Sequence, residues 1–195
     1  MSYVDIIKKS FQLLIFNHDA LVRIVGTKQA VLYGWITLLI SGIFAGIRED
    51  ASSMLVLANL SFLIPTDVQY LFLRSRLFMI LLLAFLFLII VGVTFFLYHF
   101  LAKFVFGGKA TWEHYFRAFS NSYVFYWFII LPFIDPVIIA FVLALVNIFI
   151  IYKLYQLSLW KAVAVAVVIP LVIIIALQAL ILGSLGLFNP GLFVS

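Results

Sequence analysis

The sequence predicts an all-α protein embedded in a membrane, a polytopic helical bundle of five transmembrane helices with an N-terminal amphipathic interfacial helix. The first observation is composition, because 67% of the 195 residues are apolar, 10% are charged and the mean hydropathy is +1.31. A soluble domain could not cover its surface with so few charges, whereas lipid can solvate the outer face of every helix. The second observation is that apolar runs recur at close to the roughly 20 residues that cross a bilayer. The third is that basic residues flank these runs asymmetrically.

Residues 1–28 form a cytosolic amphipathic segment in this prediction. At 100° per residue, a helix over 2–16 gathers apolar side chains on one side and polar ones on the other. The apolar side holds Tyr3, Val4, Ile7, Phe11, Leu14 and Ile15, and the opposite side holds Asp5, Lys8, Lys9 and Gln12. Such a helix suits the membrane interface near anionic headgroups, and the alternative is packing on the cytosolic ends of the spans. Asn17 is placed to cap a short second helix that reaches Val25.

Residues 29–195 form the transmembrane domain, with spans at about 29–47, 77–102, 118–134, 136–152 and 162–182. In the first span, Gly42 and Gly46 are four residues apart, a spacing that permits another helix to approach closely. The charged run at 48–50 is expected to end that span. Residues 52–73 are interrupted by Pro65 and are expected to form an interfacial or re-entrant excursion, since eleven apolar residues are too few to cross.

Helix breaks and caps divide the second half of the chain. Gly107-Gly108 ends the helix of the second span, and Thr111 is placed to cap the next, with Glu113 favourable in its first turn. Residues 133–135 lie between two prolines, which forces a tight hairpin and makes Asp135 a cap or interfacial residue. Ser158 could cap the fifth span.

The basic residues lie unequally on the two sides of this arrangement. Three of the twelve, Arg48, Arg74 and Arg76, lie on one side. The other nine lie on the opposite side, at Lys8, Lys9, Arg23, Lys28, Lys103, Lys109, Arg117, Lys153 and Lys161. Since basic residues accumulate in cytosolic loops, we expect a cytosolic N-terminus and an external C-terminus. The net charge of +5 is then a consequence of topology, and no nucleic-acid partner is expected.

The titratable residues form no complete catalytic constellation, so no enzymatic activity and no cofactor or metal is expected. The chain has no cysteine, which excludes thiolate catalysis and cysteine-based metal sites. A zincin needs two histidines one helical turn apart with a glutamate between them, whereas Glu113-His114 stands alone and His99 lies across the glycine break. The Ser158–Lys161 spacing matches a nucleophile–base pair, but a helix cap and a positive-inside anchor explain both residues better.

Transport through a polar path is the alternative function. Uncharged polar residues fall within the expected spans, notably Asn121, Asn147 and Gln178. A coupled transporter or proton relay usually needs an ionisable group near the midplane, and the prediction places none there. These three residues are therefore interpreted as intramembrane hydrogen-bond partners, with an uncharged path or an oligomeric pore left as the alternative.

Contact with anionic lipid or with a protein partner is the leading functional hypothesis. It rests on basic residues of the N-terminal helix and of the loop after the second span: Lys8, Lys9, Lys103, Lys109 and Arg117. Basic groups beside a membrane attract anionic lipid by about 1 kcal/mol each. Topology requires the same charges in the same places, so these residues alone do not separate lipid binding from orientation. A homo-oligomer is a further partner hypothesis.

Several landmarks of the second half resemble the Yip-domain family. They are Gly107-Gly108-Lys109-Ala110-Thr111-Trp112, Phe116-Arg117-Ala118-Phe119-Ser120, Leu131-Pro132, Asp135-Pro136, and Tyr155-x-x-Ser158-x-x-Lys161-Ala162. An amphipathic N-terminus that enters a first span extends the resemblance over nearly the whole chain. The resemblance implies five spans and a membrane-organising or trafficking-type role.

Eukaryotic members of that family are named for interaction with Rab/Ypt GTPases, so the resemblance carries a GTPase partner as one implication. The chain lacks the long polar N-terminal region that presents partner-binding sequence in those members. It is therefore more similar to the shorter prokaryotic members, and a prokaryotic cytoplasmic membrane is the expected location.

Overall fold

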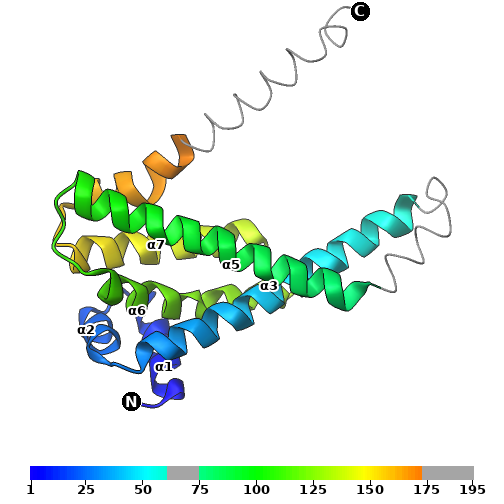
Figure 1. Cartoon of the computed structure of the whole chain (residues 1–195), viewed down its shortest axis with the longest axis horizontal. Helices are drawn as coiled ribbons and strands as arrows, with labels where there is room; N and C mark the ends of the chain where they lie inside the picture. The colour runs from blue at the N-terminus through cyan, green and yellow to red at the C-terminus, as the bar shows by residue number, and fades with distance from the viewer. Residues whose placement is uncertain (61–74, 173–195) are drawn as a thin grey trace, which may run out of the picture.

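The computed structural model describes residues 1–60 and 75–172, and the described chain is all-α (Figure 1). Seven α-helices lie within these residues, joined or extended by short π- and 3-10 helices. The α-helices are α1 (Tyr3–Leu13), α2 (His18–Gly26), α3 (Ala30–Leu60), α5 (Arg76–Phe100), α6 (Trp112–Ser122), α7 (Pro136–Leu154) and α8 (Leu159–Val163). The other helices are η1 (Leu101–Val105), η2 (Tyr123–Ile130) and η3 (Ala164–Val168).

Helix α1 begins with a capping box. The Ser2 hydroxyl accepts from the backbone N–H of Asp5 at 3.2 Å, and the Asp5 carboxylate accepts from the backbone N–H of Ser2 at 3.1 Å. These two bonds satisfy N–H groups that a helix start leaves unpaired. The hydrogen bonds from Ser2 lower the pKa of the exposed Asp5 carboxyl.

Helix α2 starts as predicted, because the Asn17 side chain accepts from the N–H of Ala20 at 3.0 Å.

Helix α1 packs on the bundle by a face that the sequence pattern did not single out. Its buried residues are Ile6, Ser10 and Leu13, which follow one another at helical spacing, and the helix contacts α3, α6 and η2. Much of the predicted apolar side, including Val4 and Ile15, is exposed. The packing of α1 on the bundle, one of the two predicted placements, is therefore observed, while its contact with lipid stays a prediction.

Helices α3 and α5 lie side by side as the two longest elements (Figure 1). The candidate span in α3 ends at Glu49, within the charged run as predicted, while the helix itself continues beyond the span to Leu60. Residues 48–60 contain neither glycine nor proline, so nothing in the backbone chemistry stops the helix there. The remainder of the expected excursion, 61–73, lies outside the described residues.

Three helices are long and apolar enough to cross a membrane in the part of the chain that the structure describes. They are Ala30–Glu49, Arg76–Val105 and Pro136–Leu154, which match the first, second and fourth expected spans. The described part of the expected fifth span includes α8 and η3, and a shorter apolar helical stretch covers Leu159–Val172. Its continuation to residue 182 lies outside the described residues.

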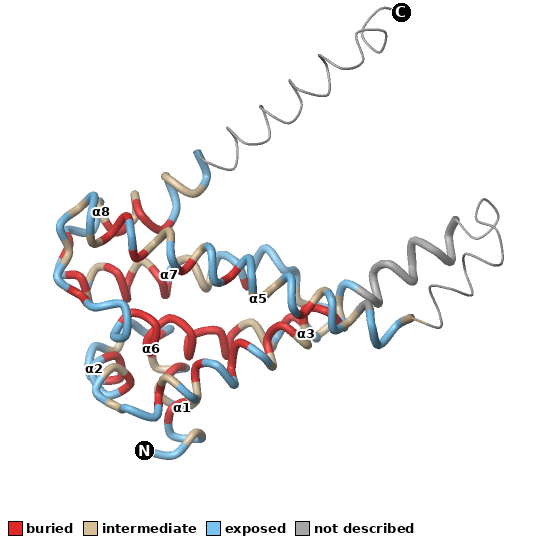
Figure 2. Tube along the Cα trace, in the orientation of Figure 1, coloured by how far each residue is buried: buried red, intermediate tan, exposed pale blue. Residues whose placement is uncertain are grey.

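The expected third span is built differently from a continuous α-helix. Helix α6 starts at the predicted cap, where Thr111 accepts from the N–H of His114 at 3.3 Å. Helix α6 ends at Ser122 and is followed directly by the 3-10 helix η2. Every residue from Tyr115 to Ser122 is buried, and Figure 2 shows α6 as the most continuously buried element. Packing on α1, α2, α3 and α7 buries this segment at the centre of the bundle.

The hairpin between η2 and α7 is fixed by two side chains. Asp135 caps α7, accepting from the N–H of Val137 at 2.8 Å, which confirms its predicted capping role. Arg48 of α3 donates through Nη1 to the carbonyls of Ile129 and Leu131 at 2.6 and 3.0 Å. A cation is favourable there because the end of a helix exposes unpaired carbonyl oxygens.

A basic cavity between helices α2, α6 and α7

A cavity of about 450 Å³ opens where α2, the turn that leads into α3, α6 and the end of α7 meet. Five of its lining residues carry basic or imidazole side chains, and none carries a carboxylate. The lining residues are His18, Leu21, Val22, Val25, Gly26, Lys28, His114, Arg117, Lys153 and Leu154. The apolar residues come mainly from one side of α2, so the cavity combines an apolar wall with a cationic one.

Local folding brings the basic groups of the cavity together from four separate stretches. His18 begins α2 directly after its Asn17 cap, and Lys28 lies in the turn from α2 to α3. His114 is in the first turn of α6, which Thr111 caps. Lys153 lies in the last turn of α7, where its charge also complements the carbonyl end of the helix.

Arg117 of α6 connects two walls of the cavity, because it also contacts α2. Its Nη1 donates to the carbonyl of Val25 near the end of α2 at 2.6 Å, and its Nη2 pairs with Glu113 one turn earlier in α6. The side chain is buried, and its Nε has no hydrogen-bond partner. A buried guanidinium that keeps one donor unpaired is costly, so the site has hydrogen-bonding capacity beyond what the protein supplies.

The other basic groups of the cavity are exposed and available to a ligand. His18, Lys28 and His114 have no ion-pair or hydrogen-bond partner for their side chains within the described residues. Lys153 lies over the ring of Tyr152, with its Nζ 4.6 Å from the ring centroid. Glu113 is paired with Arg117, so its carboxylate offsets one of the positive charges. The arrangement favours an anion.

The predicted lipid-contact residues divide between this cavity and other surfaces. Arg117 lines it, whereas Lys8, Lys9, Lys103 and Lys109 do not. Lys9 donates to Gln12 at 3.0 Å within α1, and Lys103 lies over the ring of Phe104 at 5.9 Å. Lys109 is exposed, and its backbone N–H donates to the carbonyl of Tyr155 at 3.2 Å.

Two of the three predicted intramembrane polar residues, Asn121 and Asn147, are buried and hydrogen-bonded. Asn121 Nδ2 donates to the carbonyls of Ala30 and Arg117, both at 2.8 Å, while its Oδ1 has no partner. Asn147 Oδ1 accepts from the hydroxyl of Tyr115 at 3.1 Å. Neither lines the basic cavity. Gln178 lies outside the described residues.

The two glycines expected to allow helix packing face α5. A Cβ atom added at Gly42 would lie 3.0 Å from the carbonyl oxygen of Ala84, and one at Gly46 would lie 2.5 Å from that of Ile80. The backbones of α3 and α5 therefore approach closely along this side.

The histidines do not assemble into a metal centre within the described residues, where no three His, Cys, Asp or Glu side chains gather. His99 is buried, and its Nδ1 shares a hydrogen bond with the hydroxyl of Tyr155 at 2.5 Å. His114 lines the basic cavity, and Glu113 beside it pairs with Arg117.

The fold and its three apolar helices define the class: an all-α chain with candidate membrane spans and a cationic cavity at one end of the bundle. Comparison with protein-family models, with curated proteins and with solved structures found no match in any of the three.

Four of the five basic cavity residues were not predicted as site residues. Lys28 and Lys153 were attributed to topology and His114 to an incomplete zinc motif, while His18 was only the residue after the predicted cap at Asn17. The sequence does carry one indication of such a site, because the positive-inside pattern gathers the basic cytosolic segments at one end of a bundle. It does not reveal which of their basic residues share a cavity.

Proposed function

We propose that this chain is a non-enzymatic integral membrane protein that organises lipid at the cytosolic face by binding anionic, phosphate-bearing groups in the basic cavity. The observation that carries the proposal is the lining of that cavity, with five basic or imidazole side chains and no carboxylate. A phosphate group suits such a site because it accepts several charge-assisted hydrogen bonds at once.

The position of the cavity supports a ligand from the membrane surface. Lys28 lies just before the candidate span that starts at Ala30, and Lys153 lies in the last turn of the span that ends at Leu154. Both therefore lie at the level where a bilayer presents its headgroups. The positive-inside pattern makes this end cytosolic, and the cytoplasmic leaflet carries the anionic lipid.

Helix α1 adds a second contact with the bilayer. Val4 in α1 and Ile15 just after its end are exposed on the same apolar side, whereas Phe11 between them also contacts the rings of Phe125 and Phe128. A helix that is anchored to a bundle by one face and enters the headgroup region with the other can order or bend the adjacent leaflet.

A binding titration of the full chain in detergent tests the proposal. The probes are a short-chain phosphatidylglycerol, the matching phosphatidylcholine, and inorganic phosphate. Each of the variants Lys28→Gln and Lys153→Gln should weaken phosphatidylglycerol binding about fivefold, the equivalent of about 1 kcal/mol. Inorganic phosphate competes if the site recognises phosphate itself, and it has no effect if a lipid is required.

Lys109→Gln is the matched control, since it removes the same charge from an exposed residue outside the cavity. Its affinity should equal that of the unmodified protein. Equal weakening by all three variants would mean that net surface charge, and not the cavity, attracts the lipid. Thermal unfolding of each variant checks that the bundle remains folded.

Membership of the Yip-domain family is proposed on the residues that carry the resemblance. One feature supports it: two separate parts of the motif set lie together, since the N–H of Lys109 donates to the carbonyl of Tyr155. A Cβ atom added at Gly108 would lie 2.7 Å from Tyr155 Cβ. A side chain at position 108 would collide with Tyr155, so this contact accounts for the presence of both Gly108 and Tyr155 in the motif set. An experimental structure of an undisputed family member with a different packing of this loop would contradict the assignment.

A further inference from the structure

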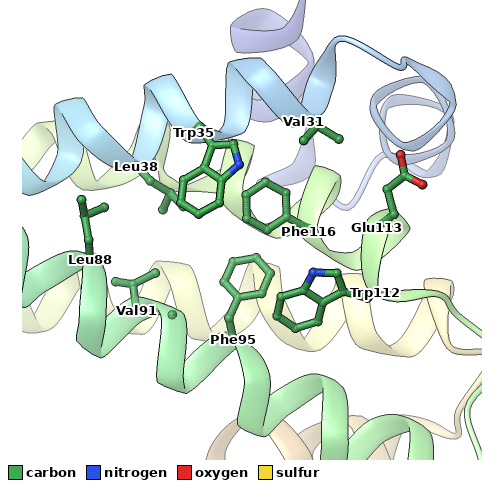
Figure 3. Close-up of a pocket in the computed structure, with 10 residues that line it drawn as sticks. Val31, Trp35, Leu38, Leu88, Val91, Phe95, Trp112, Glu113 and Phe116 are labelled. Carbon is green, nitrogen blue, oxygen red and sulfur yellow. The ribbon is translucent and has the colours of Figure 1, made fainter.

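A second cavity lies between α3, α5 and α6, and its chemistry is the opposite of that of the basic one. It has a volume of about 260 Å³. Its lining is apolar except for Glu113, and four aromatic rings dominate it: Trp35, Phe95, Trp112 and Phe116. Figure 3 shows these rings turned toward a common space, with the Glu113 carboxylate directed away from them.

The cavity lies at membrane depth. One wall, from Val31 to Leu38, belongs to the candidate span Ala30–Glu49, and another, from Leu88 to Phe95, belongs to the candidate span Arg76–Val105. It is open to the surroundings of the protein, since Trp35 is 55% exposed. In a bilayer the surroundings at that level are lipid chains.

A glycine leaves part of this space unfilled. Gly92 of α5 lines the cavity, and a Cβ atom added there would meet nothing within 4 Å. Glycine in a helix interior is unfavourable relative to alanine, so a side chain at this position would favour the helix. Gly42 and Gly46 differ, because the partner helix contacts them directly. Gly92 therefore borders open space instead of a helix contact.

We infer that this cavity binds one acyl chain of a bilayer lipid. The space is open on one side and its lining is apolar apart from Glu113, so in a bilayer it is filled by lipid chains and not by water. An engineered apolar cavity of about 150 Å³ takes up benzene. The larger space here accommodates a longer apolar segment, and acyl chains are the apolar molecules present at this depth. The inference stands on this cavity alone and does not require the basic cavity to bind phosphate.

Photocrosslinking in lipid nanodiscs tests the inference, because the deep wall of the cavity is hidden from bulk lipid. A diazirine side chain replaces Val91, which lines the cavity and is 5% exposed, in the full-length protein. Irradiation should give a lipid adduct by mass spectrometry. The same label at Val146, which is 1% exposed and does not line the cavity, should give none. A label at Val93, which is 63% exposed, reports ordinary contact with bulk lipid.

A cavity-filling variant completes the test. Gly92→Phe should reduce the adduct at position 91 severalfold and leave the adduct at position 93 unchanged. Adduct formation at position 91 no greater than at position 146 would overturn the inference, and so would an adduct that Gly92→Phe leaves intact. Leu38, which also lines the cavity and is 3% exposed, is the second labelling position if the label at 91 disturbs folding.

The experiment separates this inference from the proposed function. Gly92→Phe should leave phosphatidylglycerol titration at the basic cavity unchanged, and Lys28→Gln should leave the adduct at position 91 unchanged. Loss of both signals in either variant would show that the two cavities are not independent.

Discussion

Replacing Gly46 with alanine tests the close approach of α3 and α5. A Cβ atom at this position would lie 2.5 Å from the carbonyl oxygen of Ile80 and 3.2 Å from its carbonyl carbon. The obstructing atoms belong to a helix backbone, so they cannot rotate away as a side chain would. The two helices must separate locally, and overpacking of this kind costs about 1–3 kcal/mol.

Gly92→Ala is the matched reference for this prediction. Both positions lie inside helices that face one another, and each exchange gains the same helix propensity, about 0.5–1 kcal/mol. At Gly92 the new methyl group meets open space. The difference between the two variants therefore isolates the steric cost of about 1–3 kcal/mol.

Thermal unfolding of purified protein in detergent measures the difference. For a chain of this size, 1 kcal/mol corresponds to a shift of about 2–4 °C, so the Tm of Gly46→Ala should lie about 2–12 °C below that of Gly92→Ala. Gly42→Ala should fall between them, since its Cβ would lie 3.0 Å from the nearest carbonyl oxygen. A Tm for Gly46→Ala equal to or above that of Gly92→Ala would refute the packing argument.

Three other contacts give predictions of their own. Arg117→Gln removes donors to an α2 carbonyl and to a carboxylate, so α2 should exchange its amide hydrogens faster, by the equivalent of about 1.5–3 kcal/mol, and unchanged exchange would contradict this role. Tyr115→Phe leaves Asn147 Oδ1 unpaired and should lower stability by about 0.6 kcal/mol or more in thermal unfolding, whereas no loss would mean that the bond is not formed. The lowered pKa of Asp5 makes the α1 cap fully effective above the unfolded-state value of about 3.9, and the cap is lost as pH falls through the lowered folded value. Amide chemical shifts at the start of α1 should report this loss, and Asp5→Asn should abolish the pH dependence.

The starts of helices could be predicted from sequence because capping is local. Asn17, Thr111 and Asp135 each accept a hydrogen bond from an N–H two or three residues ahead, so the residue type and its position before an apolar run carry the signal. The same locality explains the second and fourth expected spans, whose apolar runs correspond closely to α5 with η1 and to α7.

Features that depend on distant parts of the chain could not be predicted. The charged run after Ile47 marks the end of the candidate span, but the helix continues to Leu60, and Arg48 donates to the carbonyl of Ile129 in η2, about 80 residues away. The packed face of α1 depends on what covers Ile6 and Leu13, which the periodicity of an isolated helix does not encode.

The basic cavity is the clearest case of a long-range feature. Lys28, His114 and Lys153 are separated by tens of residues, and each has a local explanation in topology or capping. Their proximity follows from the packing of α6 against both α2 and α7, and Arg117 adds a hydrogen bond to the Val25 carbonyl of α2. Sequence could indicate that these groups share one end of the bundle, but not that they line one space.

The lipid retained by the purified protein tests the central claim most directly. The full chain is extracted from a membrane of mixed anionic and zwitterionic lipid, and native mass spectrometry compares its lipid adducts with those of two double variants. Lys28→Gln with Lys153→Gln removes two charges from the basic cavity, and Lys103→Gln with Lys109→Gln removes two from outside it. We expect the first pair to lose the preference for anionic lipid, about 25-fold if the two effects of about 1 kcal/mol add, while the second pair keeps it. An undiminished preference in the first pair would contradict the account.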